Sequence, residues 1–111
     1  MEKVQFGITL DWGKGKHGSY AFAELDHFRD CVGDLEEPLR SNYRQLLEDL
    51  LARKVKKTTM VDRKALETLR DDLDNRCQID YREDHWDDDP EITAGGKYFG
   101  DLAAKLTKHL A

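Results

Sequence analysis

Cysteine and proline are scarce in this sequence, which has two of each among 111 residues. Cys31 and Cys77 lie far apart and outside any C-x-x-C spacing, which argues against a disulfide framework and against a zinc cluster. No apolar run approaches the roughly 20 residues that span a bilayer. The start, MEKVQFGITL, also lacks the apolar segment of a secretory signal. We therefore expect a cytoplasmic protein that does not bind a membrane.

Catalytic motifs are missing as well. The glycine-rich stretch at 13–18, GKGKHG, lacks the Gly-Lys-Ser/Thr ending and the following helix of a phosphate-binding loop. There is no nucleophile elbow, and neither cysteine has a histidine partner that the sequence reveals. We expect a protein that is not an enzyme and has no cofactor.

Apolar material is sufficient for one modest core. Hydrophobic residues make up 39% of the chain and charged residues 37%, and the mean hydropathy of the chain is −0.78. Regular apolar periodicity along most of the chain argues against a disordered protein. We predict a single domain covering residues 1–111, present as a monomer or a homodimer.

Short alternating patterns predict three strands. Large apolar residues alternate with polar or small ones from Val4 to Trp12, and Tyr20 and Phe22 alternate with alanines in the SYAFAEL run that follows the glycine-rich stretch. An N-terminal β-hairpin with its turn at 13–18 fits this pattern. Ile79 and Tyr81 alternate in the same way, which predicts a short third strand near 78–83.

Apolar spacings of three and four predict about four helices. One helix begins near Leu25; a second covers 36–57; a third runs from 62 to about 76 with Asp62 as its N-cap; a fourth lies at the C-terminus. Pro90 and the glycine pair at 95–96 predict that residues 83–97 form an irregular segment. The predicted fold class is α+β, a small, largely antiparallel sheet packed by these helices.

Negative charge is concentrated in one part of the chain. The formal net charge is −5, yet residues 71–91 contain ten acidic residues against Arg76 and Arg82. Such a segment repels phosphate, so we expect no direct binding of nucleic acid and an attraction to basic protein surfaces.

The densest part of this segment is EDHWDDDPE, at 83–91. Carboxylates this close together suit a hard cation such as calcium or magnesium. A calcium loop begun at Asp87 would need glycine at its sixth position and glutamate at its twelfth, where the chain has Ile92 and Tyr98. The hypothesis that these carboxylates bind a metal ion in another arrangement predicts an alternative function, that of a metal-assisted hydrolase or nucleotide-processing enzyme. Its candidate residues are Asp84, His85, Asp87, Asp88 and Asp89.

Trp86 stands among these acids and Tyr81 precedes them. An aromatic residue within a charged rim is typical of a protein interface, although Trp86 could equally turn inward and hold the loop. The predicted partner-binding residues are Asp71, Asp72, Asp74, Asp80, Tyr81, Glu83, Asp84, Trp86, Asp87, Asp88, Asp89 and Glu91.

In size and charge the chain resembles small acidic bacterial or phage proteins that inhibit by occlusion, namely immunity proteins against nuclease toxins and anti-restriction or anti-CRISPR proteins. The resemblance implies a non-catalytic inhibitor. Its acidic surface would mimic the regular charge of a nucleic acid and cover a basic site on a nuclease, toxin or nucleic-acid-binding complex.

Overall fold

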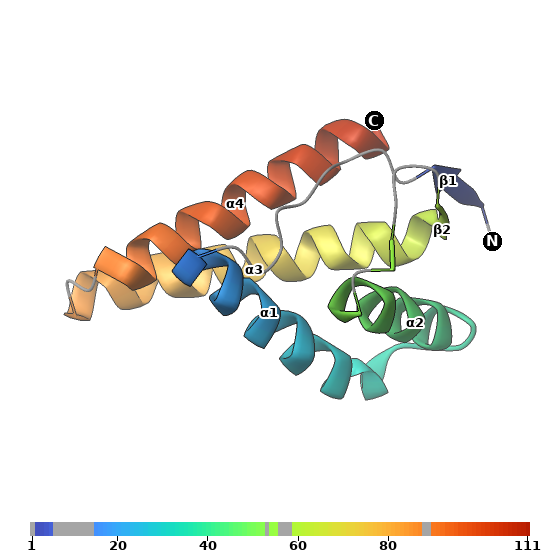
Figure 1. Ribbon diagram of the computed structural model, residues 1–111, viewed down its shortest axis with the longest axis horizontal. Helices are drawn as coiled ribbons and strands as arrows, with labels where there is room; N and C mark the ends of the chain where they lie inside the picture. The colour runs from blue at the N-terminus through green and yellow to red at the C-terminus, as the bar shows by residue number, and fades with distance from the viewer. Residues whose placement is uncertain (1, 6–14, 53, 56–58, 88–89) are drawn as a thin grey trace.

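The structure, a computed structural model, describes residues 2–5, 15–52, 54–55, 59–87 and 90–111, and for 15–21, 78–87 and 90–96 it describes only the backbone. Its elements in chain order are β1 (Lys3–Gln5), α1 (Gly15–Asp30), the 3₁₀ turn η1 (Val32–Asp34), α2 (Leu39–Leu51), β2 (Met60–Asp62), α3 (Arg63–Asp87) and α4 (Pro90–Leu110). Figure 1 shows their arrangement.

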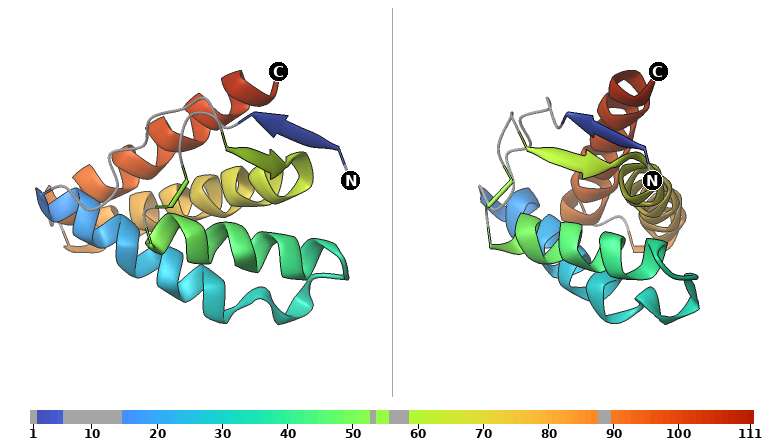
Figure 2. Two further views of the ribbon diagram at one scale, coloured as in Figure 1. Left: turned by 45° about the vertical axis from the view of Figure 1, so that its right-hand side comes forward. Right: turned by 90° about the vertical axis from the view of Figure 1, so that its right-hand side faces the viewer.

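The two longest helices, α3 and α4, pack against each other and form the central pair of the molecule. They run antiparallel along its long axis, and α1 and α2 pack against one side of the pair (Figures 1 and 2). A helix rises 1.5 Å per residue, so the 25 residues of α3 span about 37 Å. The longest dimension of the molecule is 42 Å. The length of α3 therefore sets the elongated shape.

Leucines at helical spacing build the core. Each helix contributes one apolar stripe, and the stripes meet between the α1–α2 layer and the α3–α4 pair. The buried members are Leu25, Val32, Tyr43, Leu46, Leu47, Leu50, Ala65, Leu66, Leu69, Leu73, Phe99, Leu102, Ala103, Leu106 and Leu110. Burying leucine side chains of this kind stabilises a fold by about 1.5–3 kcal/mol each.

A carboxylate and a hydroxyl hold the start of α2. The Ser41 hydroxyl donates to both oxygens of Glu37 at 2.9 and 2.7 Å, and the Arg40 guanidinium donates to the same carboxylate at 2.8 Å. These hydrogen bonds, from Ser41 first and Arg40 second, hold the pKa of Glu37 below its ordinary value. A negative charge in this position also complements the helix dipole.

The small sheet joins the N-terminal segment to the segment that leads into α3. β1 pairs with β2 in antiparallel register, with Val4 opposite Val61. The Arg63 amide donates to the Glu2 carbonyl at 2.8 Å, which continues the pairing into the start of α3. His109, near the end of α4, lies 2.6 Å from the Gln5 carbonyl. The sheet thus packs across the ends of α3 and α4, as Figure 2 shows.

The predicted α+β class is confirmed, since four helices and one antiparallel sheet occur within the described residues. Helices form near Leu25, within 36–57, from 63 onward and at the C-terminus, although α2 covers Leu39–Leu51 and not the whole of 36–57. Among these residues, no helix has both the length and the hydrophobicity needed to cross a membrane.

The predicted N-terminal hairpin is wrong. Residues 15–30, which include the expected second strand, form α1, and β1 pairs instead with β2. Most of the expected first strand and the first two residues of the expected turn, which together make up 6–14, lie outside the described residues. The alternation of Tyr20 and Phe22 competes with the three-residue spacings from Phe22 to Leu25 and Phe28. The helical pattern prevails because it buries Leu25 completely in the common core.

The predicted strand at 78–83, the expected helix end near Asn75 and the irregular segment at 83–97 are also wrong. α3 continues to Asp87, and α4 already begins at Pro90. Proline fits the first turn of a helix, where its missing N–H has no partner in any case. The glycine pair at 95–96 lies within α4, where each glycine costs about 1 kcal/mol relative to alanine. Packing between α3 and α4 offsets that cost.

Candidate functional site

The first three predicted site residues, Asp71, Asp72 and Asp74, do not share one face of α3. Asp71 and Asp74 are exposed, and Asp71 pairs with the neighbouring Arg70 at 3.1 Å. Asp72 is half-buried and bonds to α2. Consecutive residues of a helix lie about 100° apart, so one face cannot hold all three carboxylates. Asp72 therefore does not share the exposed face of Asp71 and Asp74.

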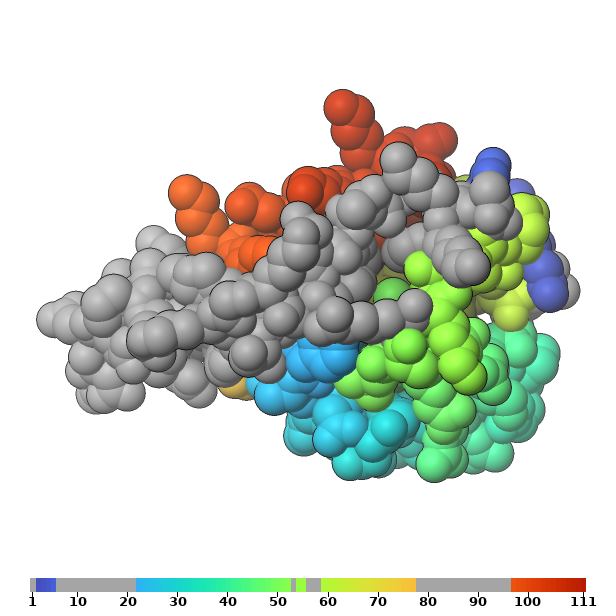
Figure 3. Space-filling view, in the orientation of Figure 1, coloured from blue at the N-terminus to red at the C-terminus, as the bar shows by residue number. Residues whose placement is uncertain are grey.

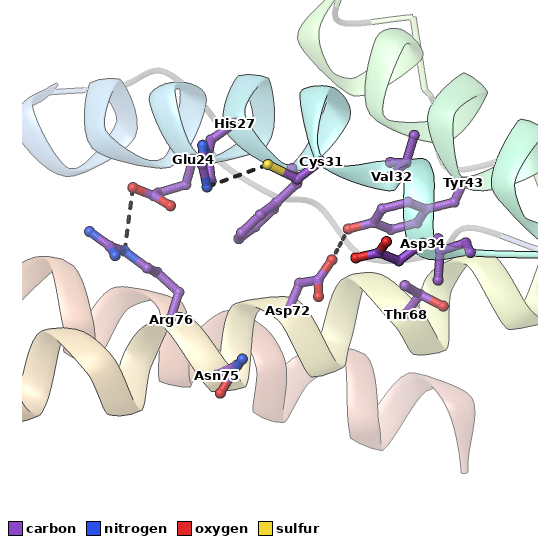
Figure 4. A pocket seen from close by; sticks show the side chains of 12 residues that line it. Glu24, His27, Cys31, Val32, Asp34, Tyr43, Thr68, Asp72, Asn75 and Arg76 are labelled. Carbon is purple, nitrogen blue, oxygen red and sulfur yellow. Dashed lines mark hydrogen bonds and ion pairs between the residues drawn. The ribbon is translucent and has the colours of Figure 1, made fainter.

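Asp72 instead lines a cleft between α1 and α3, which we call the α1–α3 cleft. Its volume is about 280 Å³. The lining residues come from α1, the η1 region, α2 and α3: Glu24, His27, Phe28, Cys31, Val32, Asp34, Leu35, Tyr43, Thr68, Asp72, Asn75 and Arg76 (Figure 4).

A hydrogen bond between Tyr43 and Asp72 forms the floor of the cleft. The Tyr43 side chain is buried, with 1% of its surface exposed, and its hydroxyl donates to the Asp72 carboxylate (Figure 4). Burial raises the pKa of the Tyr43 hydroxyl above its ordinary value, and the bond to Asp72 adds to this effect. Tyr43 therefore remains a neutral donor.

The pKa of the Asp72 carboxyl is raised above its ordinary 3.8. Burial is the main cause, and the nearby charge of Asp71 acts in the same direction, whereas the Tyr43 bond opposes them. Within the part of the chain that the structure describes, no lysine or arginine forms an ion pair with Asp72. The charge of this carboxylate is thus only partly compensated.

An ion pair closes the other end of the cleft. Arg76 Nε lies 3.3 Å from Glu24 Oε1, and these side chains are 24% and 13% exposed. The pair joins α1 to α3, and its opposite charges cancel (Figure 4). Partial burial makes such a pair matter more than one on the surface, where ion pairs contribute about 0–1 kcal/mol.

Exposed polar groups surround the opening. His27 Nε2 lies 3.7 Å from Sγ of Cys31, the residue that follows the end of α1. Asp34 is exposed at the end of η1. Phe28 and Leu35 are half-buried and give the cleft an apolar wall. The site combines an apolar wall with three carboxylates and a single guanidinium.

The remaining predicted site residues lie beyond the cleft. Asp80, Tyr81, Glu83, Asp84, Trp86 and Asp87 belong to the second half of α3, and Glu91 belongs to the first turn of α4. The side chains of these residues, and Asp88 and Asp89 altogether, lie outside the description.

No metal centre occurs where side chains are described: this part of the chain has no group of three or more His, Cys, Asp or Glu able to hold an ion. The metal hypothesis for 84–89 lies outside those residues.

Of the residues that line the α1–α3 cleft, only Asp72 was among the site residues predicted from the sequence. Glu24, His27 and Cys31 are spaced by three and four residues, so a helical reading of 15–30 would have placed them on one face. Because the SYAFAEL run, which contains Glu24, was predicted to be a strand, this helical spacing was not recognised. The helical spacing of Tyr43 with its leucine neighbours is readable from the sequence, but this spacing does not reveal the hydroxyl's partner 29 residues later.

Comparison with known proteins identifies no relative of this chain. The chain matches no protein-family model, no curated protein and no solved structure.

Proposed function

We propose that the protein is a non-catalytic inhibitor or adaptor that covers a basic site on another protein. The acidic segment, residues 71–91, is the proposed contact surface. The partners that fit are nucleases, toxins and nucleic-acid-binding complexes, whose Lys/Arg surfaces normally hold phosphates.

The observation that carries this proposal is the continuity of α3. A single helix runs from Arg63 to Asp87, so the acids up to Asp87 are carried on one rigid element. α4 returns alongside it from Pro90. A flexible loop would lose conformational freedom when it binds, whereas a packed helical hairpin has largely lost it on folding.

Exposed charge supports the same proposal. Asp71 and Asp74 are exposed on the first half of α3, and Asp71 has 69% of its side chain open to solvent. Ten acids against two arginines in 71–91 produce a field that attracts a basic surface. Such fields accelerate association, most of all at low salt.

The test is capture of a partner from extracts of the native host and of organisms that share its environment. The bait is the wild-type protein or a variant with Asp→Asn at 84, 87, 88 and 89. We expect the wild type to retain a partner that duplex DNA displaces and that the variant fails to retain. Displacement by DNA identifies the covered surface as one that binds phosphates.

A matched control neutralises four exposed acids outside the acidic segment, at Glu2, Asp30, Glu36 and Asp101. It changes net charge by the same amount, and we expect it to retain the partner. Equal retention by wild type and both variants, or a complex that DNA does not displace, would contradict the proposal.

A further inference from the structure

Two of the three carboxylates of the α1–α3 cleft make no ion pair within the described residues. The charge of Glu24 is balanced by Arg76 at 3.3 Å. Asp72 accepts from the neutral Tyr43 hydroxyl, and Asp34 stands exposed at the opening. A ligand that enters here therefore meets two carboxylates without a counter-charge, which favours a cation and disfavours an anion.

Burial makes this imbalance significant at Asp72. A carboxylate that loses water without gaining a cation is destabilised in its charged form, and the raised pKa of Asp72 reflects that. A cation placed in the cleft would replace the lost hydration. The same group on an open surface would gain much less from it, because water already stabilises the charge.

The cleft has room for one side chain rather than a large ligand. Its 280 Å³ could hold several water molecules, each of which occupies about 30 Å³ in the liquid, or one extended side chain. Phe28 and Leu35 line the apolar wall, which suits the methylene stem of a long basic residue. An aromatic ring also attracts a planar guanidinium lying over its face.

The cleft lies on the same helix as the acidic second half of α3, next to it along the chain. Asp72 and Arg76 are four residues apart, and the same spacing of three and four places positions 79, 83 and 86 on one line of the helix with them. A protein bound along the second half of α3 would thus lie in line with the cleft.

We propose that the α1–α3 cleft receives an arginine side chain of the basic protein partner, with the guanidinium between Asp34 and Asp72 and the stem against Phe28. This deepens the proposed function and rests on it. An arginine fits better than a lysine, because its planar fork of donors can engage two carboxylates at once.

The test needs no partner. N-acetyl-arginine amide is titrated into the isotopically labelled full-length protein and followed by NMR. Two further probes are the lysine analogue and the neutral isostere N-acetyl-citrulline amide. We expect saturable, millimolar binding of the arginine probe with shifts at Phe28, Asp72 and Arg76, and binding at least about tenfold weaker for citrulline.

Charge-neutralising variants locate the site. Asp72→Asn keeps the shape of the side chain and should weaken arginine binding about fivefold or more. Asp74→Asn removes the same charge from an exposed position of α3 that does not line the cleft, and should change binding less than twofold. Asp34→Asn, at an exposed position, provides a second cleft variant if Asp72→Asn fails to fold.

Two results would overturn the inference: equal affinity for arginine and citrulline, or equal weakening by Asp34→Asn and Asp74→Asn. Failure of the cleft would leave the capture experiment intact, since that experiment tests positions 84–89. A captured partner together with an empty cleft would therefore refute this inference and retain the proposed function.

Discussion

At the scale of single residues, Asp72 differs most from its neighbours. Asp71 and Asp74 extend into water, while Asp72 turns toward Tyr43 and loses much of its hydration. Three acids within four positions thus have two different roles. Two supply charge to a surface, and the third supplies an acceptor to a half-buried cleft.

Asp72→Asn should change how stability depends on pH. The raised pKa of Asp72 means that the folded state holds this proton more tightly than the unfolded state, whose pKa is near 3.8. The contribution of Asp72 to stability therefore falls as pH rises from 3.8 through the raised folded value. Asparagine does not titrate, so the variant escapes this fall.

The measurement is urea unfolding of wild type and variant at about pH 3 and about pH 7. We expect the stability of Asp72→Asn relative to wild type to improve between the lower and the higher pH. Asp74→Asn serves as the control at an exposed position. If the difference between Asp72→Asn and wild type is the same at both pH values, the effect of burial on Asp72 has been misjudged.

At the scale of elements, the α3–α4 pair depends on a close approach at Gly100. A Cβ built on Gly100 would lie 2.9 Å from Cys77 Sγ, closer than such atoms normally come. The small size of Gly100 therefore allows α4 to pack closely on the middle of α3.

Gly100→Ala should destabilise the protein despite the better helix propensity of alanine. Overpacking costs about 1–3 kcal/mol, and alanine recovers about 1 kcal/mol of this within a helix. We expect a net loss of about 1 kcal/mol in the free energy of unfolding, measured with urea.

The decisive comparison repeats the substitution in a Cys77→Ala background, which removes the sulfur. There Gly100→Ala should become neutral or stabilising, because only the helix propensity remains. An identical effect in both backgrounds would mean that the sulfur is not the obstacle, since residues in contact are expected to show an interaction energy.

At the scale of the whole molecule, acidic residues are concentrated toward one end of the long axis. The sheet and the leucine-rich halves of α3 and α4 occupy one end, and the acidic second half of α3 leads to the other (Figure 1). Figure 3 shows the second half of α4 along one side of the described surface, with α1 and α2 on the opposite side. Repulsion within 71–91 acts on a protein whose net charge is already −5.

Salt should therefore stabilise the protein. Raising NaCl from about 10 to about 300 mM shortens the screening length from about 30 Å to less than 8 Å, and we expect the melting temperature to rise by roughly 2–4 °C. The variant neutralised at 84, 87, 88 and 89 should show less than half of this rise. The variant neutralised at Glu2, Asp30, Glu36 and Asp101 should keep most of it. Equal salt responses in the two variants would mean that repulsion involving positions 84, 87, 88 and 89 does not cause the stabilisation by salt.

The sequence by itself determined where α2, the first half of α3 and the second half of α4 lie, and which of their faces are apolar. The stripe from Leu39 to Leu51 and the stripe from Leu66 to Leu73 could be read directly, because a spacing of three and four residues is a local property of a helix. The concentration of charge in 71–91 was equally readable. The helical part of the α+β class followed from these stripes, whereas the sheet forms from β1 and β2 and not from the predicted strands.

Only the tertiary structure decided the short elements and the cleft. The alternations around Phe22 and Ile79 became helical because α1 packs against the core and α3 continues alongside α4. β1 is a strand because β2, distant in sequence, pairs with it. The contact of Tyr43 with Asp72 joins two helices 29 residues apart. Strand pairing and side-chain partners depend on which segments meet, and local periodicity does not carry that information.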